Sequence, residues 1–469
     1  MSVALKTLIL MAWLIGMPAS WAWADEVPPP PPSTKSALKF AAESERLFQH
    51  YCAHCHGTHG EGDGYNSEFL EKDPADLTDI EFVSKKTNDQ IFRTIHQGGA
   101  GIRKSHLMPV FGNTLSEEEI WGLVAHIRKL AGDDSHPLTL PLGVMKKARP
   151  EPISLTRGHV KAFLQWFLKE KSKDELVSWG RRLFEEKKSC FACHRVGDEG
   201  GKVGPDLTRA GFDYKPEWLF AWVQNPQNMK KKTKMPNLGL RTDEAIAITA
   251  FLSTLKGEVS EIPEEWGPYM ETAGDPKRGE ALFYDPDGKA NCVKCHWILG
   301  KGGKVGANLS MVGSSRTLPF LLESILDPTA VITVGFSSMM VLTKEKKFIT
   351  GIKKGEDDSS LTIFTKEGTL ITIPKERIKK FKVQKLSMMP GNYKDILTVR
   401  EIQDLLAYLN TLQPPILKNL GSPELDSEEE EERAIDIQLL RKEDGGPVAS
   451  KESTRGERGE GPSRSDNKE

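Results

Sequence analysis

Six cysteines occur in the 469-residue chain, and all six fall into three copies of one short pattern. In each copy two residues separate the cysteines and a histidine follows at once: Cys52-Ala53-His54-Cys55-His56, Cys190-Phe191-Ala192-Cys193-His194 and Cys292-Val293-Lys294-Cys295-His296. Two thiols at this spacing can form thioethers with the two vinyl groups of one haem, and the adjacent imidazole can bind the iron as proximal ligand. A zinc site needs two such pairs that converge, and a thiol redox pair needs no trailing histidine. The pattern, here called the haem motif, therefore predicts three covalently attached haem c groups.

A methionine followed by proline comes after each haem motif: Met108-Pro109, Met235-Pro236 and Met389-Pro390. A thioether sulfur is a soft ligand for the sixth position of haem iron, and His/Met ligation raises the reduction potential. A lone methionine would more often be core packing, but three copies in the same place favour ligation. The predicted axial ligands are therefore His56, Met108, His194, Met235, His296 and Met389. Two alternatives stay open, namely Met388 in place of Met389, and a histidine in place of Met108 (His54, His59, His96 or His106).

Each haem motif lies between two predicted helices. The upstream helix ends in Leu-Phe, as in Ser44–Phe48, Gly180–Phe184 and Gly279–Phe283. The downstream helix ends in Ala-aromatic-Ile/Leu-x-x-Leu, at Ala125–Leu130, Ala250–Leu255 and Ala407–Leu412. Glycine in the first helix would let the second cross closely, with its aromatic residue at the crossing. The first copy has Ser44 and His126 at these places, so its crossing is expected to be looser or more hydrated.

Each repeat resembles a class I cytochrome c domain, and the three together cover nearly all of residues 36–415. The resemblance implies a small α-helical fold around the haem, with a Gly-Pro-x-Leu turn whose carbonyl accepts the proximal imidazole N–H. The second repeat matches this turn fully at Gly204-Pro205-Asp206-Leu207. Gly306-Ala307-Asn308-Leu309 lacks the proline, and Pro74-Ala75-Asp76-Leu77 has it one place early, which puts this contact in doubt for the first and third haems.

The third repeat contains an insertion. Met389 follows His296 by 93 residues, whereas the corresponding separations are 52 and 41 in the first and second repeats. Alternating apolar residues predict four short strands, at 339–343, 348–352, 361–365 and 370–373. We expect a small antiparallel β insertion at about 336–385. This segment resembles a haem-binding domain of planctomycete-type bacterial cytochromes.

The fold class predicted is mainly α, with three tandem class I cytochrome c domains and a disordered C-terminal tail. The predicted boundaries are 1–24 for a signal peptide, 25–35 for a proline-rich tether, 36–132 for domain 1, 133–174 for a linker with a helix, 175–256 for domain 2, 257–274 for a second linker, 275–415 for domain 3 and 416–469 for an acidic and polar tail. An apolar patch in the first linker, 163–168, is expected to pack between domains, with a partner-docking helix as the alternative.

The N-terminus has the features of an export signal. Lys6 supplies a positive start, residues 8–14 are apolar, and Ala22-Trp23-Ala24 provides a small-x-small cleavage site. We therefore expect the periplasm, with an uncleaved N-terminal membrane anchor as the alternative. No later segment is long and apolar enough to span a bilayer. The formal net charge of -2 argues against nucleic acid as a partner.

The sequence predicts an electron-transfer protein and not an enzyme, because three six-coordinate irons leave no open position for a substrate. Redox partner proteins are expected, such as other cytochromes, a dehydrogenase, or a quinol-oxidising or terminal oxidase complex. The chain is either a free carrier or the cytochrome subunit of a respiratory complex, with a possible association with the membrane through that complex. A lysine run, Lys230-Lys231-Lys232-Thr233-Lys234, directly precedes Met235 and suits the steering of an acidic partner. The alternatives are a haem peroxidase or reductase, or a redox or gas sensor, with the third haem open.

Overall fold

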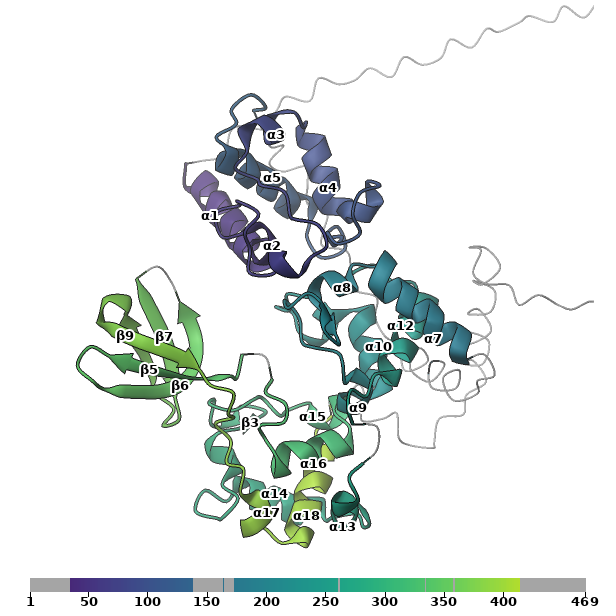
Figure 1. Cartoon of the computed structure of the whole chain (residues 1–469), viewed down its shortest axis with the longest axis vertical. Coiled ribbons are helices and arrows are strands. Elements are labelled where there is room, and N and C mark those ends of the chain that lie inside the picture. The colour runs from purple at the N-terminus through teal and green to yellow at the C-terminus, as the bar shows by residue number, and fades with distance from the viewer. Residues whose placement is uncertain are drawn as a thin grey trace, which may run out of the picture.

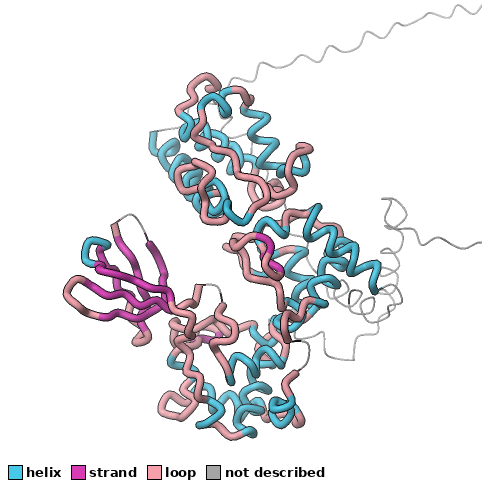
Figure 2. The backbone as a smooth tube through the Cα atoms, in the orientation of Figure 1, coloured by secondary structure: helices cyan, strands magenta, loops and turns pink. Residues whose placement is uncertain are grey.

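The computed structural model describes residues 34–137, 163, 173–259, 262–333, 335–356 and 359–413. Three helical units follow one another along the molecule, and a five-stranded sheet projects sideways next to the third unit (Figures 1 and 2). Buried apolar side chains form one cluster in each helical unit and a fourth in the sheet, and the cluster of the third unit also includes Phe212 of the second. The predicted signal peptide, nearly all of the tether, most of the first linker and the predicted tail lie outside the described residues.

The helices of the first unit have well-defined ends. They are α1 (Thr34–Tyr51), α2 (Ala53–His56), the 3₁₀ turn η1 (Ser67–Phe69), α3 (Ile80–Ser84), α4 (Asn88–Gly101) and α5 (Glu117–Ala131). Ser116 and Glu119 form a reciprocal capping box at the start of α5, which satisfies two N–H groups that have no partner within the helix. Gly132 ends the same helix in the left-handed conformation, with φ 64°, that favours glycine.

The second and third units repeat this plan with shorter helices. The second contains α7 (Lys173–Arg182), the π-helical turn η2 (Leu183–Lys187), α8 (Cys190–Cys193), β1 (Arg195–Val196), β2 (Glu199–Gly200), α9 (Ala210–Asp213), α10 (Pro216–Gln224), α11 (Pro226–Met229) and α12 (Thr242–Thr254). The third contains η3 (Glu264–Trp266), α13 (Gly267–Met270), α14 (Pro276–Tyr284), η4 (Cys292–Lys294), β3 (Trp297–Ile298), β4 (Lys301–Gly302), α15 (Val312–Ser315), α16 (Leu318–Leu326), α17 (Tyr393–Ile396) and α18 (Val399–Asn410). Each haem motif is therefore the short turn between a first helix and the loop that follows.

Glycine permits the predicted close helix crossing in the second and third units. A Cβ added to Gly180 would lie 1.9 Å from the carbonyl oxygen of Ala247. A Cβ added to Gly279 would lie 1.9 Å from that of Asp404. Aromatic rings meet beside both crossings, at 5.6 Å for Phe184 and Phe251 and at 5.7 Å for Phe283 and Tyr408. The two helices of each pair therefore touch backbone to backbone, as the sequence predicts.

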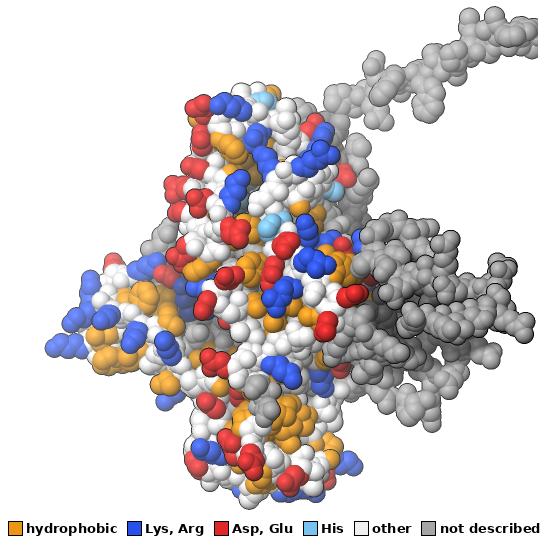
Figure 3. All heavy atoms as spheres, turned by 45° about the vertical axis from the view of Figure 1, so that its right-hand side comes forward, with side chains coloured by type: hydrophobic (Ala, Val, Ile, Leu, Met, Phe, Trp, Pro, Cys, Tyr) orange, Lys and Arg blue, Asp and Glu red, His pale blue; other side chains and the backbone are white. Residues whose placement is uncertain are grey.

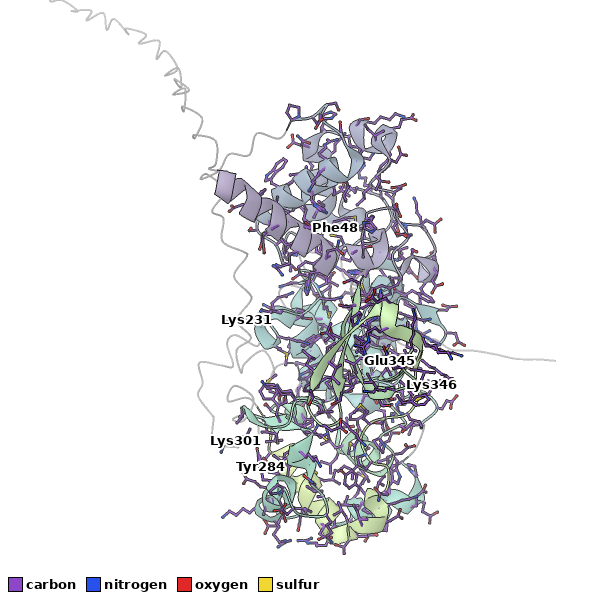
Figure 4. The ribbon with its side chains drawn as sticks, turned by 90° about the vertical axis from the view of Figure 1, so that its left-hand side faces the viewer. Phe48, Lys231, Tyr284, Lys301, Glu345 and Lys346 are labelled. Carbon is purple, nitrogen blue, oxygen red and sulfur yellow. The ribbon has the colours of Figure 1, made fainter. Side chains whose placement is uncertain are left out.

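The first unit has its glycine on the other helix. A Cβ added to Gly122 of α5 would lie 2.4 Å from the Ser44 hydroxyl of α1. Ser44 is only 4% exposed, and its hydroxyl donates to the carbonyl of Phe40. The His126 ring lies 4.9 Å from the ring of Phe48, which Figure 4 labels within this unit. The crossing is looser than in the other two units, as predicted, because a Cβ on Gly122 would meet the side chains of Ser44 and Phe40 and not a backbone carbonyl.

The second and third units meet through the same segment of each repeat. Tyr214 and Arg316, which occupy equivalent places seven residues after Leu207 and Leu309, form an isolated antiparallel β-bridge. Next to this bridge, the N–H of Lys215 donates to the Ser315 carbonyl and the N–H of Thr317 to the Asp213 carbonyl. Arg209 also pairs with Glu323 across the contact. The interface is therefore built around an approximate two-fold relation between repeats.

The β insertion is an antiparallel sheet of five strands, β5 (Ser338–Thr343), β6 (Phe348–Glu356), β7 (Ser360–Thr365), β8 (Leu370–Pro374) and β9 (Ile378–Val383), in the order β8-β7-β6-β5-β9. The four predicted strands are confirmed as β5 to β8. Met339, Val341, Leu361 and Ile363 lie in its core. Figure 4 labels Glu345 and Lys346 at the β5–β6 turn, and Figure 3 shows basic and apolar side chains together on this lobe.

The sequence did not predict β9, which lies at the edge of the sheet. Its side chains are exposed except for that of Ile378, so it lacks the apolar alternation that marks a strand. Its three lysines (Lys379, Lys380 and Lys382) are typical of an edge strand, where charge discourages pairing with another chain. Among the described residues, no helix has the length and apolar character needed to cross a membrane.

Candidate haem sites

In each of the three motif histidines, the same ring nitrogen, Nδ1, forms a hydrogen bond with a backbone carbonyl. The Nδ1 to oxygen distances are 2.9 Å from His56 to Ala75, 2.9 Å from His194 to Pro205 and 3.0 Å from His296 to Ala307. A carbonyl oxygen can only accept, so Nδ1 carries the proton and Nε2 keeps the lone pair that can bind iron. Burial lowers the pKa of all three imidazoles, which favours the neutral form that ligation requires.

The turn that supplies each carbonyl is built in the same way in every unit. The residue after it is Asp76, Asp206 or Asn308, and its side-chain oxygen accepts from the backbone N–H and the hydroxyl two residues later, on Thr78, Thr208 or Ser310. Ala75 and Ala307 thus stand where the second unit has Pro205. The contact uses a carbonyl and not the proline ring, so the sequence departures from Gly-Pro-x-Leu do not remove it.

In the third unit an apolar pocket joins the predicted ligands. Its lining side chains are those of Phe283, Cys292, His296, Leu309, Ile325, Met389, Tyr393, Leu397, Leu405 and Leu409. It therefore brings together one motif cysteine, the motif histidine and the predicted distal methionine, among apolar neighbours that suit a porphyrin. Met389 lines the cavity and Met388 does not, which favours Met389 as the ligand.

The six cysteines form no disulfide with one another within the described residues. Burial raises the pKa of Cys52, Cys190 and Cys193 to about 12 and that of Cys292 to about 11. Within the same residues, no group of three or more His, Cys, Asp or Glu side chains could hold a metal ion.

Three atoms of Met235 form hydrogen bonds with neighbouring residues. Its backbone N–H donates to the Thr233 hydroxyl, and its carbonyl accepts from the Gln227 amide. Its Sδ accepts a hydrogen bond from the Trp222 indole, with Nε1 and Sδ 3.0 Å apart. In the third unit the N–H of Met389 likewise donates to the Ser387 hydroxyl. The sequence did not predict the role of Trp222, because nothing in the chain order places it beside Met235.

In the first unit Met108 and the four candidate histidines have different surroundings. Met108 packs against the core of this unit. His106 Nε2 lies 3.0 Å from the Glu185 carbonyl of the second unit, and the His96 ring stacks on Phe92 at 5.6 Å. His59 is exposed. His54 is buried, its Nδ1 has no hydrogen-bond partner in the described part of the chain, and burial lowers its pKa to about 4.

The first and second units meet at their haem motifs, where Asn66 is completely buried. Its amide nitrogen donates to the carbonyl of Ala192, inside the second motif, at 2.9 Å, and lies 3.5 Å from the Cys55 sulfur of the first. Its amide oxygen accepts from the N–H of Lys202 at 2.7 Å. One side chain therefore joins the two motifs. Chain order gave no sign of this, since Asn66 and Ala192 are 126 residues apart.

Two other predictions change in the structure. The lysine run lies against the first unit, because Thr233 hydrogen-bonds His50 and the charge of Lys234 acts on both His50 and His54. The run thus borders two units, with Lys230, Lys231 and Lys232 exposed.

Phe163 does not pack between domains. It is fully buried in the core of the second unit, where it stacks on Phe220 at 4.7 Å. Residues 164–168 of the predicted patch lie outside the described residues.

Comparison with known proteins identifies two of the three units. Residues 40–127 match the family model described as cytochrome c oxidase, cbb3-type, subunit III, and residues 177–256 match the cytochrome c model. No curated protein sequence matches the chain. Among solved structures, a chain of the reducing HAO-like protein complex of Kuenenia stuttgartiensis is 21% identical, covers 45% of this chain and 95% of its own length, and has a TM-score of 0.17. The first two helical units are therefore cytochrome c domains, which bind haem c covalently and serve in haem-based electron transfer.

Proposed function

We propose that the protein is an exported cytochrome with three haems that passes electrons between redox partner proteins. The observation that carries this proposal is the threefold repetition of one arrangement, a motif histidine whose Nδ1 donates to a backbone carbonyl. The third unit has the same arrangement as the two units that match cytochrome c models. When bound, haem c supplies one-electron chemistry at its iron. The motif histidines and the predicted methionines would hold the group, and in the third unit His296 and Met389 share an apolar pocket.

Closed ligation favours electron transfer over catalysis. His296 and Met389 line one apolar cavity, so the protein itself can supply both axial ligands there. A substrate or a gas would have to displace the Met389 sulfur, which the Ser387 hydroxyl helps to position through the Met389 backbone. The third unit was the candidate for an open haem, and its geometry supports a closed one.

The contacts between units support a relay. Asn66 joins the first two motifs, because its amide donates to the Ala192 carbonyl and lies 3.5 Å from the Cys55 sulfur. The second and third units share the interface at Tyr214 and Arg316. Electrons that enter one end of the chain can therefore reach the other without a separate encounter between molecules.

The proposed location is the periplasm, on the basis of the export signal predicted from the sequence. The proposed partners are redox proteins, either for a free carrier or within a respiratory complex. The exposed side chains of Lys230, Lys231 and Lys232 suit an acidic partner near the junction of the first two units. Replacing all three by glutamine should weaken the dependence of the electron-transfer rate on salt. An unchanged salt dependence would remove this surface from the proposal.

A haem count on the purified full-length protein tests the proposal. We expect three haems per chain from absorbance after denaturation, and an intact mass that includes all three. Replacing Cys292 and Cys295 by serine should remove one haem only, and the matched pair Cys190 and Cys193 should do the same. A count of two in the unmodified protein, unchanged by the Cys292/Cys295 variant, would show that the third unit holds no covalent haem.

A further inference from the structure

A continuous stack of flat side chains leads from the interface with the third unit to the predicted distal ligand of the second. We call it the aromatic stack, and its members are Phe320, Arg316, Tyr214, Trp218 and Trp222. The last of them donates its indole N–H to the sulfur of Met235 at 3.0 Å. We propose that the aromatic stack is the path by which the second and third haems exchange electrons, a role that rests on the proposed function.

The spacing within the stack is regular. The ring centroids of Tyr214 and Trp218 are 5.0 Å apart with planes 10° from parallel, and those of Trp218 and Trp222 are 5.1 Å apart at 19°. Residues four apart share one face of a helix, and Trp218 and Trp222 belong to α10. These separations are within the range of favourable stacked pairs. The three rings therefore form one rigid column along the helix.

Arg316 carries the stack across the interface. Its guanidinium carbon lies 4.0 Å from the ring centroid of Tyr214 and 4.3 Å from that of Phe320. The planar guanidinium stacks on aromatic faces, and the β-bridge between Tyr214 and Arg316 fixes its backbone. Phe320 is buried in the core cluster of the third unit, together with Phe283 and other residues that line the cavity of His296 and Met389.

Helix packing alone does not account for the end of the stack. Tyr214 and Trp218 have counterparts in the third repeat, Arg316 and Phe320, but the counterpart of Trp222 is Ser324. The third unit thus folds the same segment without this ring. In the second unit the stack extends to the predicted distal methionine, where the Trp222 indole N–H donates to the Met235 sulfur.

The step itself is a single electron exchange. A reduced iron in one unit loses one electron and becomes ferric, and the oxidised iron in the other gains it and becomes ferrous. No proton moves and no bond is made or broken. Tunnelling weakens less steeply through packed atoms than across gaps, so the stack provides a better path than the surrounding loops.

The test follows electron exchange in the half-reduced full-length holoprotein, through the NMR signals of the ligand methionine methyl groups. Trp218→Leu removes one ring from the middle of the stack and should slow exchange between the second and third haems several-fold. Trp218→Phe keeps a ring and should retain most of the rate. Trp179→Leu is the matched control, because Trp179 packs on the same core outside the stack, and its rate should stay unchanged. Equal rates in Trp218→Leu and the unmodified protein would overturn the proposal.

The reduction potential of the second haem provides a readout that does not depend on the rate. The Trp222 N–H withdraws electron density from the Met235 sulfur, so Trp222→Phe should lower this potential, by about 59 mV for each tenfold change in the equilibrium constant. Trp218→Leu should leave it unchanged, which shows that the fold and the ligand are intact. An unchanged reduction potential in Trp222→Phe would show that Trp222 does not act on the second haem through Met235. Absence of exchange in the unmodified protein would instead contradict the proposed function.

Discussion

Replacing Gly279 by alanine should destabilise the third unit, because the helix crossing has no room for a side chain. The new Cβ would lie 1.9 Å from the Asp404 carbonyl oxygen, whereas ordinary contact begins at 3.4 Å, so α14 and α18 must separate by about 1.5 Å. Overpacking of this kind costs roughly 1–3 kcal/mol, and a displacement this large places it at the upper end. Alanine is more favourable than glycine within a helix by about 1 kcal/mol, which offsets part of this cost. The net loss is therefore about 2 kcal/mol, a fall of roughly 4–8 °C in unfolding temperature.

Calorimetry of the holoprotein measures this change as a lowered transition for the third unit. The matched control is Gly267→Ala, which is also helical and also in the third unit, but whose added Cβ would meet no atom within 4 Å. The control should be neutral or slightly stabilising. An equal unfolding temperature for Gly279→Ala and the control would refute the argument, since it would show that the crossing tolerates a side chain.

Three further predictions concern the haem sites and their supports. Met389→Leu should abolish the charge-transfer band of one ferric haem and let the reduced protein bind carbon monoxide, whereas Met388→Leu should change neither, as optical titration will show. Asn66→Ala leaves the buried carbonyl of Ala192 without its hydrogen bond, which costs about 1–3 kcal/mol of stability. The variant should also slow electron exchange between the first two haems. An unchanged exchange rate, measured by NMR, would contradict this prediction. Hydrogen bonds from Ser135 and then Arg128 lower the pKa of Asp133 to about 2, against 3.8 for the free group. Their stabilisation is therefore present above about pH 4 and lost as the pH falls toward 2, so the stability difference between the unmodified protein and Asp133→Asn should close over this range in pH-dependent melting.

Short-range patterns in the sequence predicted much of the structure. The cysteine and histidine spacing located the motifs, and alternation found strands β5 to β8 because their apolar residues face one core. The glycine at the helix crossing was predictable in two units because it sits on the first helix. In the first unit the glycine at the crossing is Gly122, on the opposite helix, and it faces side chains and not a backbone carbonyl, which fits the looser crossing predicted from Ser44.

Contacts between distant segments could not be predicted. Asn66 and Trp222 look like an ordinary polar residue and an ordinary aromatic residue in the chain order. Their roles depend on Ala192 and Met235, which the fold brings to them. Similarly, the loss of the Gly-Pro-x-Leu pattern suggested a missing carbonyl contact, because the sequence shows which side chain is present but not where its backbone oxygen points.

The central claim is that three haems are each closed by a histidine and a methionine of this chain. A carbon monoxide titration of the reduced, full-length protein tests it most directly, together with the ferric spectrum of the same sample. The account predicts three haems, a methionine-to-ferric-iron charge-transfer band from each, and no binding of carbon monoxide. One haem that binds carbon monoxide readily would contradict closed ligation at that site and show that the protein presents an open iron.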